Sequence, residues 1–218
     1  RPVVVFNPHS YEVEYPVKMY HPSKSVTDGE GNEVSFQNVR SSRSNDSHLD
    51  TLFLAKVKPF GYNTFWLEPD HQAYAPKQLD NTDDLFMENE YISVEFDAAT
   101  GYIKSLVDKA TGEDLASDNF LAIPTVIDDE GTDTWAHNVF KFHKVKGIME
   151  LVSIERVESG ALRSVIRTKH KFNDSYLTQE FVLAKKQKTL RVDCKAMWQE
   201  KFTMLKFAFP IQLFQIPI

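Results

Sequence analysis

Alternation of apolar and polar residues is the feature that most limits how this chain can fold. Residues 12–20 (EVEYPVKMY), 91–97 (YISVEFD), 161–172 (ALRSVIRTKHKF) and 189–198 (TLRVDCKAMW) all alternate with a period of two. That period is typical of strands that bury one face. No segment of ten or more residues shows a convincing helical period. The sequence therefore predicts an all-β protein.

Turn-forming residues separate these runs. They occur at 27–32 (TDGEGN), 97–101 (DAATG), 108–114 (DKATGED) and 185–188 (KKQK). Glycine, aspartate and asparagine favour tight turns, so the runs are expected to form successive antiparallel hairpins. Short strands at regular spacing favour a β-sandwich over a parallel α/β sheet.

One composition shift suggests a domain boundary. Residues 69–84 (PDHQAYAPKQLDNTDD) have no alternation and are rich in proline, acids and amides, which is typical of a linker. We therefore expect one domain over residues 1–78 and a second over 79–218. The chain ends in the apolar run 205–218 (LKFAFPIQLFQIPI), and an exposed end of that kind would promote aggregation, so we expect a truncated second domain.

The charge balance limits the partners. The 25 Lys and Arg are scattered among 31 Asp and Glu, for a net charge of −6, which argues against nucleic acid and against an anionic membrane. No apolar run approaches the roughly 20 residues that span a bilayer, and residues 1–10 do not resemble a signal peptide. A cytoplasmic location is expected.

The single cysteine fits a structural role better than a catalytic one. Cys194 shares one face of an alternating strand with Leu190, Val192, Ala196 and Trp198, which predicts a buried and inert thiol.

Catalytic patterns are absent from the sequence. There is no Gly-rich phosphate loop, no H-E-x-x-H, no G-x-S-x-G and no C-x-x-C. Potential metal ligands crowd one acidic turn, residues 128–142 (DDEGTDTWAHNVFKF): Asp128, Asp129, Glu130, Asp133 and His137, with His143 directly after it. Their spacing matches no calcium loop, so the segment alone is not predicted to bind a metal.

Aromatic and histidine residues give weaker indications. Trp135, inside the acidic turn, can either line a sugar site or plug the end of a sandwich, and both interpretations stay open. Trp66 and Trp198 lie within alternating runs and are expected in the core. Isolated polar contexts place His9, His21, His48 and His71 on the surface, whereas His170 follows an apolar face and is expected to be hydrogen-bonded and partly buried.

Five phrases in a fixed order resemble one known family. They are residues 3–17 (VVVFNPHSYEVEYPV), 58–68 (KPFGYNTFWLE), 87–115 (MENEYISVEFDAATGYIKSLVDKATGEDL), 128–142 and 190–210 (LRVDCKAMWQEKFTMLKFAFP). Together they resemble the C-terminal β region of the zinc-dependent α-mannosidases, glycoside hydrolase family 38. In that family an Asn-Pro phrase opens a small β-sandwich, a Gly-Tyr phrase closes it, and an E-N-x-Y strand begins a large domain; here these are Asn7-Pro8, Gly61-Tyr62 and residues 88–91.

The resemblance implies a small antiparallel β-sandwich followed by the first part of a large two-sheet, galactose-mutarotase-like supersandwich. It also implies retaining hydrolysis of α-mannosides by an aspartate nucleophile and a zinc ion in a preceding catalytic barrel. None of those catalytic motifs occurs in residues 1–218. The chain is therefore expected to carry no catalytic residue, metal or cofactor. Its expected partners are its own N-terminal barrel and, through the full-length enzyme, an α-mannoside or oligosaccharide.

The acidic turn also has a counterpart in the family. Bacterial members have a D-T-W phrase at this point, matched here by Asp133, Thr134 and Trp135, with His137 nearby. The resemblance implies a bacterial source and a turn in which Asp133, Trp135 and His137 help to wall the sugar site. Structural docking against the barrel is the alternative for this turn. For the whole chain the alternatives are a stand-alone carbohydrate-binding β-sandwich and a module that forms a homo-oligomer.

Overall fold

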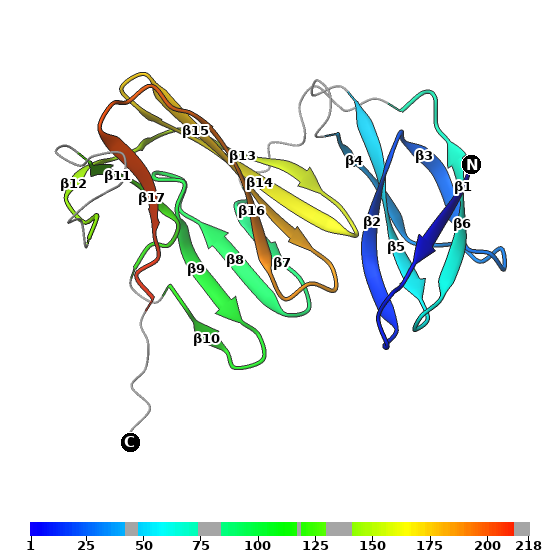
Figure 1. Cartoon of the computed structure of the whole chain (residues 1–218). Coiled ribbons are helices and arrows are strands. Elements are labelled where there is room, and N and C mark those ends of the chain that lie inside the picture. The colour runs from blue at the N-terminus through cyan, green and yellow to red at the C-terminus, as the bar shows by residue number, and fades with distance from the viewer. Residues whose placement is uncertain (42–47, 74–83, 117–118, 130–140, 212–218) are drawn as a thin grey trace. The chain divides into compact units, whose positions relative to one another are not determined.

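The computed structural model describes residues 1–41, 48–73, 84–116, 119–129 and 141–211 (Figure 1). These residues form strands and turns and no helix, so the all-β prediction is confirmed. None of them forms a helix that could cross a membrane. The chain divides into two compact units: the first unit comprises 1–81, 156–165 and 183–187, and the second unit comprises 82–155, 166–182 and 188–218. The expected boundary between residues 78 and 79 lies outside the described residues.

In its described part, the first unit is a sandwich of two antiparallel sheets. One sheet has the order β1-β6-β3 and the other β2-β5-β4. The strands are β1 (Pro2–Phe6), β2 (Val13–Tyr20), β3 (Ser23–Thr27), β4 (Phe36–Arg40), β5 (Leu49–Val57) and β6 (Tyr62–Pro69).

Alternation places every second residue of β5 and β6 in the core between these sheets. The buried residues are Val26, Phe53, Ala55, Val57, Phe65 and Leu67. The rings of Phe53 and Phe65 meet there, with centroids 5.0 Å apart. Because Phe65 and Leu67 face inwards, Trp66 faces outwards and is 52% exposed. The expectation that Trp66 belongs to the core is therefore wrong; its neighbours, not Trp66 itself, define the buried face.

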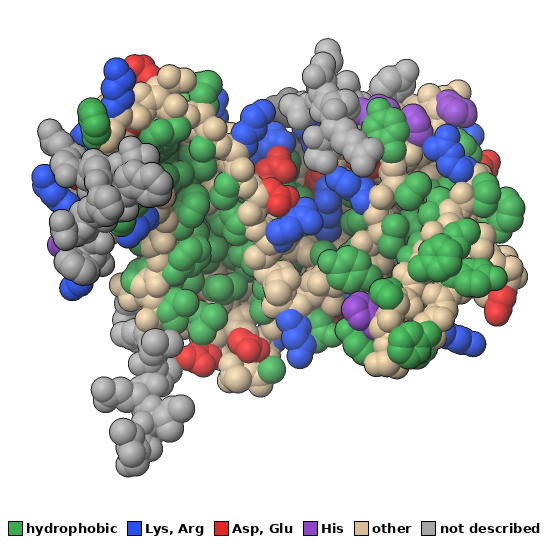
Figure 2. Space-filling view, viewed as in Figure 1, with side chains coloured by type: hydrophobic (Ala, Val, Ile, Leu, Met, Phe, Trp, Pro, Cys, Tyr) green, Lys and Arg blue, Asp and Glu red, His purple; other side chains and the backbone are tan. Residues whose placement is uncertain are grey.

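The outer face of the β1–β6 pair is correspondingly aromatic. Phe6 lies opposite Tyr62, and Pro2 lies opposite Trp66. The side chains of Phe6, Tyr62 and Trp66 are all exposed. Apolar side chains reach the surface of the first unit in Figure 2 as well.

A second cluster in the first unit joins β4 and β5 to residues 156–165. Leu162 packs with Val39 and Leu52. The Gln37 side chain acts there as an extra peptide group: its Oε1 accepts from the backbone N–H of Leu162 and of Arg163, both at 3.0 Å. Its Nε2 donates to the carbonyl of Arg163 at 3.2 Å. These bonds satisfy backbone groups of residues 162 and 163.

The second unit contains three sheets, again all antiparallel where their register is described. Their orders are β10-β9-β8-β7, β12-β11-β17 and β13-β14-β15-β16. The strands are β7 (Phe86–Glu88), β8 (Ile92–Phe96), β9 (Ile103–Asp108), β10 (Glu113–Asp114), β11 (Ile123–Asp128), β12 (Val145–Ile148), β13 (Glu150–Ser159), β14 (Arg163–Phe172), β15 (Ser175–Ala184), β16 (Leu190–Met197) and β17 (Thr203–Ala208). The ends of β13, β14 and β15 belong to the first unit.

Turn chemistry in this unit follows the sequence. Asn89 Oδ1 accepts from the backbone N–H of Tyr91 and of Ile92, which closes the turn before β8. Residues 109–112 form the tip of the β9–β10 hairpin, where Asp108 pairs with Glu113. Gly112 has a φ of +74°, a conformation that side-chain-bearing residues rarely adopt.

The expectation that one face of β16 is buried is only partly correct. Trp198 does pack against the core of Val126, Met149 and Leu177. Cys194, however, is exposed, and so is Ala196. Alternation shows which residues share a face, but it does not show whether another sheet covers that face, and β16 is the outer strand of its sheet. Partial burial of the thiol and, secondly, the carboxylate of Asp193 raise the pKa of Cys194, which keeps it protonated and unreactive.

Candidate functional site

The described ends of the acidic turn are fixed on one sheet of the second unit. The turn begins where β11 ends, and β11 is the middle strand of its sheet, paired with β17 from Ile123 to Asp128. At the last pair the backbone N–H of Asp128 donates to the carbonyl of Lys144 at 2.8 Å. The ammonium of Lys144 lies 2.6 Å from Asp128 Oδ2. The two ends of the turn are thus held together at β11.

The second anchor of this turn is β17. The backbone N–H of Asp129 donates to the carbonyl of Phe202 at 2.8 Å, and Lys206 Nζ donates to the carbonyl of Phe142. Residues 129 and 142 are therefore both fixed by hydrogen bonds to the residues that form or precede β17. Asp133, Trp135 and His137, which were expected to wall a sugar site, lie in 130–140, outside the described residues. Their role stays a prediction.

A buried histidine forms a second notable cluster in the second unit. His170, on β14, has no exposed surface, and its Nε2 lies 3.0 Å from the carbonyl oxygen of Thr100. Its ring is stacked on Tyr102, with centroids 5.7 Å apart and an angle of 16°. His170 is hydrogen-bonded as expected, and it is fully rather than partly buried because Tyr102 and the 97–102 turn cover it.

The electrostatics of this cluster favour neutral groups inside and a charge at its edge. Burial lowers the pKa of His170, against the smaller opposing effect of the Thr100 carbonyl. Burial also raises the pKa of Tyr102, whose hydroxyl donates to the carbonyl of Met149 at 3.3 Å. The Thr100 hydroxyl donates to Asp97 at 2.7 Å and lowers the pKa of that carboxyl.

The contacts of this cluster are packing contacts. The imidazole of His170 faces the carbonyl of Thr100 and the ring of Tyr102, and the hydroxyl of Tyr102 is engaged with the carbonyl of Met149. Its Nδ1 is buried without a hydrogen-bond partner among the described residues. A neutral His170 that fixes the 97–102 turn fits these contacts.

A metal centre is not supported by the described residues. Within the described ranges, no three His, Cys, Asp or Glu side chains are close enough to hold one ion. They therefore do not offer the three or four ligands that a zinc site requires.

The histidines of the first unit are less isolated than the sequence suggests. His9, His21 and His71 are exposed, as expected, but His48 is half-buried. His21, His48 and His71 line one pocket. The sequence contains no motif that links them, because the pairing of β2 with β5 creates the contact between His21 and His48.

The described residues are all-β, and a three-stranded sheet of the second unit holds both ends of the acidic turn. A family model for the "Glycosyl hydrolases family 38 C-terminal domain" matches residues 87–216, more than half of the chain. The chain belongs to this family, and it carries a C-terminal, non-catalytic domain of a glycosyl hydrolase. A search of curated proteins gives no match.

Proposed function

We propose that this chain is the non-catalytic β region of a retaining, zinc-dependent α-mannosidase, and that it supports and partly walls an active site formed by a separate catalytic domain. The observation that carries the proposal is the family match over residues 87–216. The ordered phrases, from Asn7-Pro8 to the D-T-W turn, extend the resemblance to α-mannosidases over nearly the whole chain. The zinc is assigned to the catalytic domain, as the resemblance to the family implies.

The described ends of the acidic turn support its proposed role in walling the site. They are held by hydrogen bonds at β11 and β17, which fixes where the turn begins and ends. In this proposal, Asp133 accepts a hydrogen bond from a sugar hydroxyl. Trp135 fixes the conformation of the turn. Removing a carboxylate that hydrogen-bonds a sugar would raise KM or lower kcat by roughly tenfold to a hundredfold.

The test is hydrolysis of an aryl α-mannoside by the full-length enzyme and by this chain alone, each with and without added zinc. We expect zinc-dependent activity in the full-length enzyme only. In the full-length enzyme, Asp133→Asn and Trp135→Ala should reduce kcat/KM while Asp129→Asn, at the fixed base of the turn, leaves it unchanged. Unchanged kinetics and melting temperature in both variants would remove the walling role, and activity in the isolated chain would overturn the non-catalytic assignment.

A stand-alone carbohydrate-binding module is the second candidate function, and the exposed aromatic face of β1 and β6 favours it. Phe6 and Tyr62 lie side by side with ring centroids 5.7 Å apart, and Trp66 lies further along the same strand as Tyr62. Aromatic rings on a flat sheet face can stack on sugar rings. Affinity electrophoresis of this chain in gels that contain mannan separates the two candidates: retardation that is lost in Trp66→Ala would favour the binding module.

A further inference from the structure

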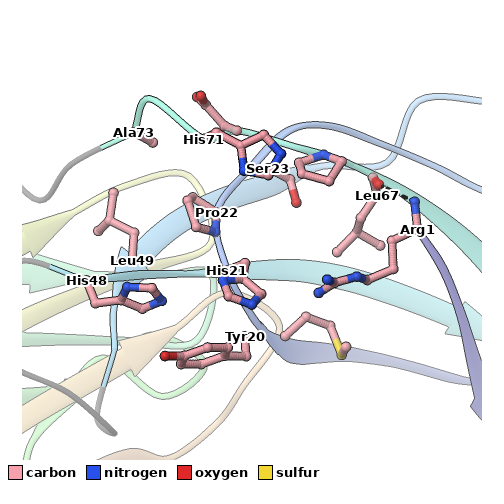
Figure 3. A pocket seen from close by; sticks show the side chains of 13 residues that line it. Arg1, Tyr20, His21, Pro22, Ser23, His48, Leu49, Leu67, His71 and Ala73 are labelled. Carbon is pink, nitrogen blue, oxygen red and sulfur yellow. Dashed lines mark hydrogen bonds between the residues drawn. The ribbon is translucent and has the colours of Figure 1, made fainter.

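A pocket in the first unit collects nitrogen-bearing side chains at the end of β2. It is lined by Arg1, His21, His48 and His71, with Tyr20 beneath the imidazoles (Figure 3). Its volume is about 290 Å³. That is close to the lower end of the roughly 300–1,000 Å³ typical of small-molecule sites.

Strand pairing explains why these side chains meet. Tyr20, the last residue of β2, is paired with Asp50 of β5, and His21 continues with a bridge to the same residue. His48 precedes β5, so its ring comes next to that of His21, with centroids 5.7 Å apart. Two histidines from distant segments thus reach the same pocket.

The backbone at His21 has a strained conformation that orients its side chain. Its φ is +86°, in the left-handed region that L residues avoid, and Pro22 follows it. The hydroxyl of Thr51 donates to the His21 carbonyl at 2.8 Å and holds this conformation. Strain of this kind persists only where the surroundings enforce it, and here it directs an imidazole into the pocket.

The ring of Tyr20 positions imidazoles and is not free for a ligand to stack on. His48 is stacked on it, with centroids 4.7 Å apart and an angle of 25°. His21 meets it edge-on at 4.3 Å. With its surface engaged in this way, Tyr20 offers no open platform for a neutral sugar ring, whereas the ring nitrogens of His21 have no hydrogen-bond partner among the described residues.

The pocket offers several hydrogen-bond donors: the guanidinium of Arg1 and at least one N–H group from each imidazole. His48 Nε2 is shielded from solvent and has no hydrogen-bond partner among the described residues. Asp70 is the one carboxylate among the pocket-lining residues that the structure describes, and its Oδ1 already accepts from the backbone N–H of Gln72 at 3.0 Å. The guanidinium and the imidazole N–H groups can together hold an oxyanion. A metal fits less well, because the described residues offer no set of three ligands.

The remaining wall of the pocket is apolar and comes from residues such as Pro22, Leu49 and Leu67. We propose that the pocket binds a small organic oxyanion: a phosphate or carboxylate group held by Arg1 and the imidazoles, on a body that lies against this apolar wall. The proposal does not depend on the assignment to the α-mannosidases.

The test is isothermal titration of the 218-residue chain with glucose 6-phosphate, gluconate, inorganic phosphate and glucose. We expect saturable binding of glucose 6-phosphate, of gluconate or of both. Comparing the two affinities shows whether the pocket prefers a phosphate ester or a carboxylate. Inorganic phosphate should bind more weakly than the organic anion, and glucose should not bind. Binding of inorganic phosphate as tightly as the organic anions, or of none of these probes, would overturn the proposal.

Two variants assign that binding to this pocket. His48→Phe keeps a ring on Tyr20 but removes both ring nitrogens, and Arg1→Met keeps an apolar stem but removes the guanidinium. Each should weaken binding about tenfold, since a hydrogen bond to a charged group is lost. His9→Phe is the matched control, because His9 is stacked on Tyr11 and does not line the pocket. Equal affinity in Arg1→Met and the control would overturn the proposal even if His48→Phe failed to fold.

Discussion

The backbone N–H of Asn7 donates to the carbonyl of Gly61 at 2.8 Å, which joins two of the phrases by which the chain resembles its family. Asn7 is also buried, and its side chain is fully used. Its Nδ2 donates to the carbonyls of Tyr11, Val57 and Lys58, and its Oδ1 accepts from the backbone N–H of His9. Asn7 thus ties the end of β1 to the loop between β5 and β6, which explains why an asparagine stands at this point.

Replacing Asn7 by alanine should therefore destabilise the first unit. The change removes the side-chain donor and acceptor and leaves buried backbone groups unpaired, which should lower the free energy of unfolding by roughly 2–4 kcal/mol. Urea denaturation measures it. Asn32→Ala is the control: Asn32 lies in an exposed turn, and its side chain bonds to Asp28 at 3.1 Å, so its loss should cost about 0.5 kcal/mol. Equal effects of the two changes would contradict the role given to Asn7.

Local chemistry was the part of the fold that the sequence could predict. Period-two runs predicted the strands, and residues 109–112 form an expected turn, because both depend on residues close in sequence. The exposures of Trp66 and Cys194 were predicted wrongly, because burial depends on which sheet covers a face. The pocket could not be predicted from the sequence either, because His21 and His48 meet only through the register of β2 on β5.

The ion pair between Glu158 and Arg163 should matter more than pairs on the surface. Both side chains are largely buried, and Arg163 binds the carboxylate through Nε at 2.6 Å and Nη2 at 2.8 Å. Glu158 Oε1 also accepts from the backbone N–H of Arg40. Glu158→Gln leaves the guanidinium buried without its counter-charge, so the free energy of unfolding should fall by about 3 kcal/mol.

The control for this change is the exposed pair of Arg191 and Asp193, which is separated by 2.9 Å. Asp193→Asn should cost less than about 1 kcal/mol, because solvent screens an exposed pair. Both free energies come from urea titrations at one pH. A Glu158→Gln variant as stable as Asp193→Asn would show that burial does not strengthen the first pair.

His170 should make the second unit less stable in acid. Burial lowers its folded-state pKa below its ordinary value near 6.5, so at lower pH the unfolded chain binds a proton that the folded chain does not. The contribution of His170 is therefore fully present above about pH 6.5 and is lost as the pH falls towards the folded-state pKa. Above about pH 7.5 no dependence on His170 is expected.

The His170→Gln variant tests this expectation, since glutamine keeps an N–H that can reach the Thr100 carbonyl but does not titrate. The difference in unfolding free energy between about pH 7.5 and pH 5 should shrink relative to the unmodified chain. His143→Gln serves as the control, because His143 is exposed. An acid sensitivity that persists unchanged in His170→Gln would assign it to another group.

Gly101 should tolerate alanine less well than Gly112, although both have the same backbone conformation. Their φ angles are +72° and +74°, so alanine costs roughly 1–2 kcal/mol of backbone strain at either position. At Gly112 a Cβ would meet nothing within 4 Å, whereas at Gly101 it would lie 2.6 Å from Leu151 Cδ1 and 3.3 Å from His170 Nε2. Overpacking should add about 1–3 kcal/mol in Gly101→Ala. Thermal unfolding of the two variants isolates this packing effect, because the shared strain cancels in their difference; equal melting temperatures would mean that Leu151 and His170 yield without cost.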